Sequence, residues 1–172
     1  MNLFKVGDKI IYPNQGIGVI EDIQLESYFG EEFKIYHVRI LTNDTLVLVP
    51  FSNADEIGIR KPITSSKVDT IFGFMSEGTV DVTMNWKGRY REHVDLMRSG
   101  TVLDVAQVFK GLYYLNSIKP LSFREKKMME KAKDLIVTEI SEVSSLSEQA
   151  IEQRLFESLS SCFKGKADRL NF

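Results

Sequence analysis

The residues best suited to chemistry lie together in the stretch MNWKGRYR, residues 84–91. This stretch holds the only tryptophan of the chain, Trp86, followed by the cations Lys87, Arg89 and Arg91. Positive charge beside a large aromatic ring suits nucleic acid, because the cations hold phosphates while the ring stacks on a base or wedges between bases. The sequence therefore indicates these four residues as candidate DNA contacts.

The same stretch has an alternative interpretation as core packing, because an apolar stripe with helical spacing starts there. The stripe consists of Trp86, Tyr90, Val94 and Met97. The charges argue against packing alone. With Asn85 as the N-cap, Lys87 lies in the first turn and Arg89 just beyond it, where the helix dipole favours acidic residues by about 0.3 kcal/mol or more. This unfavourable placement indicates that the charges have a function.

Catalysis finds little support in the sequence. The two histidines, His37 and His93, lie in different halves of the chain, and neither has a nucleophile or metal ligand at a recognisable spacing. Cys162 stands in a polar segment without a histidine partner, and adjacent carboxylates such as Glu31–Glu32 fit solvated turns. We therefore expect no enzyme activity, no cofactor and no metal site. A weaker alternative is a small enzyme in which His93 and Arg89 act on a phosphorylated substrate.

Two types of secondary structure must position these residues. Before residue 61, short β-branched runs alternate with Pro, Gly and Asn and predict five strands. The runs are KIIYP, GIGVIEDIQLE, FKIYHVRIL, TLVLVPF and IGIRK. After residue 61 the hydrophobic period becomes helical. The sequence therefore predicts an α+β protein of two modules, a compact all-β module at 1–61 and an all-helical domain at 62–172.

Capping residues mark where the predicted helices begin. Ser122, with Glu125 three residues later, forms a capping-box pattern ahead of a long amphipathic segment. Ser147 and the pair Thr64–Ser65 mark two further starts, and Gly100 follows the helix that begins at the tryptophan. Five helices are predicted in this half of the chain.

Two features of the β-module bear on binding. Gly16-x-Gly18 resembles part of a phosphate loop, but it leads into a strand and not into a helix, so we expect a hairpin that needs glycines with positive φ. In TLVLVPF, residues 45–51, the leucines point to one face and the valines to the other. Five short strands cannot bury both faces of their sheet. One face is therefore covered by the helical half or is available to another protein, by surface contact or strand addition.

Composition and charge limit the partners. The net charge of −2 at pH 7 gives no overall attraction to DNA. Residues 1–61 hold 6 basic against 9 acidic residues, and the remainder holds 16 against 15, so the second half is the better candidate for meeting a polyanion. A single cysteine cannot form an internal disulfide, and the sequence contains neither a signal peptide nor an apolar run as long as a membrane span. We expect a cytoplasmic monomer with no membrane partner.

Four blocks of sequence, in preserved order over about residues 3–160, resemble the CarD/CdnL family of bacterial RNA polymerase-binding transcription regulators. The blocks are FKVGDKIIYPNQGIGVIEDI, LVLVPFSNADEIGIRKPI, NWKGRYRE and LSFREKKMMEKAKDLIVTEIS. The β-half is also similar to the polymerase-interacting module of transcription-repair coupling factors. The resemblance implies a Tudor- or SH3-like small β-barrel that docks on the polymerase β subunit, followed by a helical domain that lies against promoter DNA.

The resemblance also implies a role for the tryptophan. In this family the matching residue wedges into the minor groove at the upstream edge of the melted region and hinders collapse of the bubble. That implies the wedge role for Trp86, with Arg89 and Arg91 as basic contacts and Lys87 as a phosphate neighbour. Contact with DNA would be largely independent of sequence, because the polymerase chooses the promoter.

The polymerase-binding face is expected on two strands of the β-module. Its residues are Tyr36, Val38, Ile40, Leu46, Val47, Leu48, Val49 and Pro50. One departure from the family is Leu48, because some members carry an arginine there. An alternative function is a protein–protein adaptor, in which the helical domain binds another regulator and Trp86 is buried.

Overall fold

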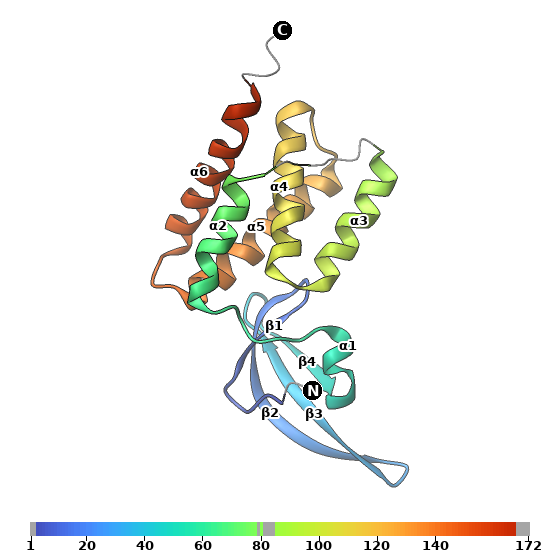
Figure 1. The fold of residues 1–172 in the computed structure, drawn as a ribbon. Helices are drawn as coiled ribbons and strands as arrows, with labels where there is room; N and C mark the ends of the chain where they lie inside the picture. Colours follow the sequence, from blue (N-terminus) through green and yellow to red (C-terminus); the bar gives the residue numbers. More distant parts are fainter. Residues whose placement is uncertain (1–2, 79, 81–84, 168–172) are drawn as a thin grey trace. The chain divides into compact units, whose positions relative to one another are not determined.

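The computed structural model describes residues 3–78, 80 and 85–167 (Figure 1). The chain divides into two compact units, Met1–Pro62 and Ile63–Phe172. The first unit is a β-sheet with one short helix, and the second is made of helices. The boundary lies one residue from the position that the sequence predicts.

The first unit is a curled antiparallel sheet with the strand order β1-β2-β3-β4 (Figure 1). Its elements are β1 (Lys9–Tyr12), β2 (Gly16–Tyr28), β3 (Glu31–Ile40), β4 (Thr45–Pro50), the 3-10 turn Phe51–Asn53 and α1 (Ala54–Ile57). This half-barrel confirms the predicted Tudor-like α+β architecture. The predicted fifth strand is wrong, because IGIRK contributes only an isolated bridge between Ile11 and Arg60.

One face of this sheet carries the core of the unit. Tyr36 is its largest apolar member: its ring stacks on Phe51, with 3.8 Å between ring centroids, and its hydroxyl accepts a hydrogen bond from the Phe4 amide at 3.1 Å. Gly18 belongs to this packing, because a Cβ there would lie 2.7 Å from a Val38 methyl group. Only Gly16 has the positive φ expected of the two glycines, so Gly18 is required for space and not for backbone conformation.

The second unit packs its helices around a continuous apolar core. The helices are α2 (Val68–Ser76), α3 (Trp86–Ser99), α4 (Val102–Ile118), α5 (Phe123–Val143) and α6 (Glu148–Ala167), preceded by the 3-10 turn Ser65–Lys67. Helix α4 is central, since it contributes more buried residues than α2, α3 or α5. Five helices were predicted here, and their starts at Trp86, Phe123 and Glu148 agree with the predicted caps.

Buried polar side chains tie the helical unit together at several points. Lys110 of α4 donates hydrogen bonds to the carbonyls of Phe74 and Glu77 at the end of α2, and thereby satisfies oxygens that a helix terminus leaves without partners. Glu139 of α5 accepts a hydrogen bond from the Ile63 amide at 3.0 Å and anchors the chain where this unit begins. Among the residues that the structure describes, no helix is both long and apolar enough to cross a membrane.

Candidate functional site

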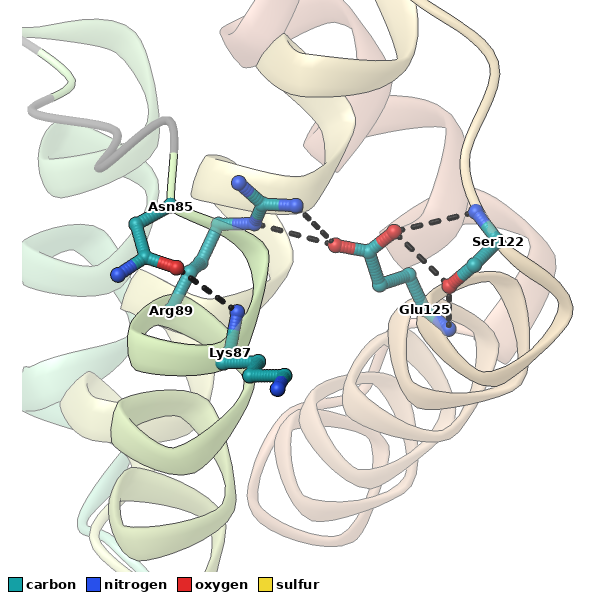
Figure 2. A network of polar contacts seen from close by, with 5 residues as sticks. All are labelled: Asn85, Lys87, Arg89, Ser122 and Glu125. Atoms are coloured by element: carbon teal, nitrogen blue, oxygen red, sulfur yellow. Dashed lines mark hydrogen bonds and ion pairs between the residues drawn. The ribbon is translucent and has the colours of Figure 1, made fainter.

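The first turn of α3 is capped as the sequence predicts. The Asn85 side chain accepts a hydrogen bond from the Lys87 amide at 3.2 Å, which satisfies one of the free amides of the helix start (Figure 2). Trp86 is the first helical residue, and its ring stacks on Tyr90 one turn later, with 5.9 Å between centroids and 18° between ring planes. The direction of the tryptophan is therefore set by a capped helix start and a ring beneath it.

Trp86 is exposed and does not belong to the core. Its exposed fraction is 40%, and it is not among the residues that form or flank the apolar core of the helical unit. The predicted stripe passes from exposed at Trp86, through half-buried Tyr90 and Val94, to buried Met97. Its periodicity is real, but its first member extends beyond the core. The core-packing interpretation of Trp86 is therefore wrong within this chain.

The three cations of the stretch have different environments. Lys87 and Arg91 are exposed. Arg89 is only 2% exposed, and its guanidinium is directed at Glu125 of α5, with Nε and Nη2 3.1 and 2.5 Å from the same carboxylate oxygen (Figure 2). The expectation that Arg89 contacts DNA directly does not fit this burial, because its charge is already paired. Lys87 and Arg91 remain available to phosphates.

Glu125 has two functions in the fold. One carboxylate oxygen accepts the Arg89 bonds, while the other accepts hydrogen bonds from the amide and hydroxyl of Ser122 at 3.1 and 2.9 Å (Figure 2). The Glu125 amide in turn donates to the Ser122 hydroxyl, which completes the predicted capping box. Burial raises the pKa of Glu125, but the hydrogen bonds from Arg89 and Ser122 outweigh it and leave the pKa below its ordinary value. Glu125 is therefore ionised at neutral pH and joins α3 to α5.

His93 completes the polar face that α3 buries. It lies one turn after Arg89, and a Cβ added at Gly111 of α4 would lie 3.7 Å from its Nε2. Burial, followed by the charge of Arg89, lowers the pKa of His93. A small enzyme using His93 and Arg89 does not fit this arrangement, because both side chains are buried and Arg89 is paired. The described residues also include no group of three metal-ligating side chains.

The structure adds basic residues that the sequence interpretation did not assign. Helix α5 begins with Phe123, Arg124, Lys126 and Lys127 exposed, and Phe123 has the Lys127 ammonium 4.8 Å from its ring centroid. Because Glu125 lies among them and pairs with Arg89, this first turn lies beside the first turns of α3. The cluster FREKK was visible in the sequence, but only the ion pair shows that it lies beside the first turns of α3.

The sheet separates the predicted polymerase contacts onto two faces. Tyr36, Val38, Ile40 and Val49 have buried side chains in the core of the first unit. Val47 and Pro50 are half-buried, whereas Leu46 and Leu48 are 42% and 54% exposed. The reason is strand alternation, which sends successive side chains to opposite faces. The side chains predicted as contacts at 36, 38, 40 and 49 are therefore core residues, and the exposed pair is Leu46 and Leu48.

Strand β4 also offers its backbone. It stands last in the sheet order and pairs with β3 over residues 45–50, so it forms an edge of the sheet. An edge strand with outward leucines can bind a protein by surface contact, by strand addition, or by both. Leu46 lies opposite Arg39 and Leu48 opposite His37, which defines the outer face of the sheet.

Comparison with known proteins assigns both units. Residues 4–63 match the family model described as the CarD-like/TRCF RID domain, and residues 70–156 match the model of the CarD C-terminal domain. The chain belongs to the CarD family. A relative from Bacillus subtilis (strain 168), named "Putative transcription factor YdeB", is 27% identical over 150 residues, which is 87% of this chain and 98% of that protein.

Each CarD-family domain carries one of the two candidate surfaces. The RID match contains all four strands and therefore Leu46 and Leu48. The C-terminal match contains Trp86 together with both partners of the ion pair, Arg89 and Glu125. Leu48, which the resemblance singles out as a departure from some family members, is exposed, so that departure concerns a surface and not the core.

Proposed function

We propose that this protein is a transcription regulator that docks on the RNA polymerase β subunit and stabilises the open promoter complex. The docking surface is the outer face and edge of β4, with Leu46 and Leu48. The DNA surface is the start of α3, where Trp86 wedges into the minor groove at the upstream edge of the bubble. The observation that carries the proposal is the exposed tryptophan, held outside the core at a capped helix start.

The side chains around Trp86 fit this function in different ways. Lys87 and Arg91 contact phosphates, since they are exposed within one or two turns of the ring. Arg89 acts as a positioning residue, because its pair with Glu125 fixes the first turns of α3 against α5. A rigid support suits a wedge, because unstacking one DNA base step costs a few kcal/mol. A mobile ring would not recover that free energy.

Additional phosphate contacts come from the start of α5. Arg124, Lys126 and Lys127 are exposed on the first turns of α5, which Glu125 joins to α3, and Phe123 offers a second exposed ring. Three to five phosphate contacts correspond to a log–log salt slope of roughly −2.7 to −4.5, at about −0.9 per contact. Such binding is weak at physiological salt, and docking on the polymerase compensates by holding the helical unit at high effective concentration near the DNA.

The adaptor alternative predicts a different behaviour of the tryptophan. It assumed a buried Trp86 and a helical surface reserved for another regulator, whereas the ring is exposed in this chain. Fluorescence tests the exposure directly, since the chain has a single tryptophan. We expect a red-shifted emission that is readily quenched in the free protein and becomes protected when promoter DNA and polymerase are added together.

The decisive experiment replaces the ring. In Trp86→Ala we expect the lifetime of the open complex to fall by about five- to a hundredfold, which corresponds to roughly 1–3 kcal/mol of aromatic–base contact. The matched control is Leu103→Ala on α4, which removes another exposed apolar side chain of the helical unit. A folded Trp86→Ala protein that binds polymerase and leaves the lifetime unchanged would refute the wedge.

A further inference from the structure

The hairpin of β2 and β3 extends beyond the rest of the sheet (Figure 1). Pairing between β1 and β2 ends at Val19, and pairing between β3 and β4 reaches no further than Ile35. The ladder between β2 and β3 continues to Tyr28 opposite Glu31. Residues 24–34 therefore form a two-stranded arm that the other two strands do not support.

The tip of this arm has an unusual turn. Phe29 and Gly30 connect the strands, with φ values of 50° and 81°. Two central residues with positive φ are typical of a type I′ turn, where Asn-Gly, Asp-Gly and Gly-Gly are preferred because other side chains are strained. Phe29 is also 92% exposed. A large apolar residue here is unfavourable for the backbone and for solvation, and departures of this kind point to function.

Apolar and acidic side chains surround the turn. Leu25, Tyr28 and Phe33 are exposed, and the Tyr28 ring packs edge-on against Phe29 with 4.5 Å between centroids. The acidic residues of the arm are Glu26, Glu31 and Glu32. Its one cation is Lys34, whose ammonium lies over the Phe51 ring of the first unit, 5.8 Å from the ring centroid. A negatively charged tip repels nucleic acid and anionic lipid, so the charge favours a protein partner with an apolar pocket edged by Lys or Arg.

The arm continues the surface that carries Leu46 and Leu48. The register places Phe33 on the same face of β3 as Ile35 and His37, and His37 lies opposite Leu48. From His37 to the turn the strand runs about 24 Å at about 3.4 Å per residue. A stable interface covers about 800 Å² of each partner, which is more than two leucines provide. A partner seated on β4 therefore has to extend along neighbouring strands.

We propose that the hairpin tip, formed by Tyr28, Phe29 and Phe33, is a second contact with RNA polymerase, with Phe29 inserted into an apolar pocket of basic surroundings. This inference rests on the proposed docking of β4 and adds a site at the far end of the same face. The carboxylates of Glu26, Glu31 and Glu32 steer the tip toward basic residues around that pocket.

The test uses a substitution that should help the fold while removing the contact. Phe29→Asn creates the preferred Asn-Gly turn, so we expect thermal stability equal to or above that of the unchanged protein. Affinity for cognate polymerase core enzyme, measured without DNA, should fall about tenfold, as is usual for an aromatic anchor. Neutralising Glu26, Glu31 and Glu32 to Gln should slow association and reduce its salt dependence.

Two control variants separate this inference from the function on which it rests. Val6→Asn removes an exposed apolar residue ahead of β1, the strand farthest from β4 in the sheet order, and should leave affinity unchanged. Leu48→Glu should abolish polymerase binding if β4 is the docking surface. If Leu48→Glu abolishes polymerase binding while the affinity of Phe29→Asn stays within twofold of that of the unchanged protein, the tip contact alone is overturned. Failure of the unchanged protein to bind polymerase overturns both.

The charge argument against lipid is tested in parallel. Vesicles of phosphatidylglycerol and phosphatidylethanolamine provide the anionic surface, and we expect no cosedimentation of the full-length protein. Vesicle binding that disappears in Phe29→Asn would overturn the assignment of the tip to a protein partner. A photo-crosslinking amino acid at position 29 should instead join the protein to a polymerase subunit.

Discussion

The outer face of β4 and the start of α3 are both exposed surfaces that we propose as binding sites, but they are supported by opposite kinds of packing. Behind Leu46 and Leu48 lies an apolar core, with Ile40 and Val49 at 1% exposure. Behind Trp86, the face that α3 buries includes Arg89 and His93. An apolar core tolerates apolar substitutions that conserve its volume, whereas a buried ion pair depends on direction and charge. The difference teaches that the proposed docking surface rests on apolar packing, whereas the orientation of the proposed wedge rests on a buried ion pair.

The strongest test of this comparison removes one half of the ion pair. Glu125→Ala leaves the buried Arg89 charge without its carboxylate, and we expect the helical unit to lose about 3–5 kcal/mol of stability. Urea unfolding, monitored by tryptophan fluorescence and by circular dichroism, measures the loss of unfolding free energy. The matched control is Arg89→Met with Glu125→Leu, which replaces the pair by apolar side chains and should restore most of the stability. Equal destabilisation by the single and double variants would show that charge is not the cause.

A paired substitution in the sheet tests its two faces. Ile40→Ala creates a cavity in the core and should cost about 2–4 kcal/mol, while Leu48→Ala should change stability by less than about 0.5 kcal/mol. For polymerase affinity the order should be reversed: Leu48→Ala should weaken binding about fivefold or more, and by more than Ile40→Ala does. Thermal melts and binding to core enzyme are the two measurements. If Leu48→Ala proved the more destabilising change, the outer face would not be a free surface.

A smaller effect concerns the charges beside the wedge. Lys87→Gln and Arg91→Gln should each reduce the log–log salt slope of DNA binding by about 0.9, because each removes one phosphate contact. Gln153→Ala on α6 is the control, since this side chain donates to Glu157 at 2.9 Å and lies outside the proposed surface. Fluorescence anisotropy on a forked promoter fragment, titrated with salt, measures the slope. An unchanged slope in both lysine and arginine variants would move the DNA surface away from α3.

The smallest effect is the response of stability to pH. The pKa of His93 is lowered in the folded protein, so below its unfolded value of about 6.5 the unfolded chain binds the proton more readily than the folded one. Stability is therefore complete above about pH 6.5 and decreases as the pH falls from there toward the folded pKa. Glu125 adds a second loss below its unfolded pKa of about 4.3. Urea melts between pH 7.5 and pH 5 should show a shallower decrease in His93→Gln.

Local signals in the sequence predicted most helix ends and the alternation of β4. The caps at Asn85 and Ser122 bond to backbone amides two and three residues away, so the local sequence is enough to predict them. Leu46 and Leu48 were assigned to one face for the same reason. The prediction that side chains on both faces make contacts is wrong for the buried face, because burial depends on the whole sheet. The predicted fifth strand is wrong for a similar reason, because its residues contribute only the isolated bridge to Ile11.

The role of Arg89 could not be predicted from local signals. Its partner Glu125 lies 36 residues away, and hydrophobic periodicity registers apolar side chains alone, so the pattern of α3 does not reveal that the helix also buries an arginine and a histidine. The misplaced positive charge near the start of α3 has a structural explanation at Arg89. Lys87 and Arg91 still require another one, which is the reason to assign them to DNA.

The shared carboxylate of Glu125 has a consequence for local opening. The same group caps α5 and holds Arg89 of α3. Fraying of the α5 start therefore releases the first turns of α3, which carry Trp86, and release of those turns uncaps α5. The two helix starts should therefore exchange their amide hydrogens as one cooperative unit, although they are far apart in the chain. A ligand that immobilises Trp86 would then slow exchange in the first turn of α5, at amides that it never touches.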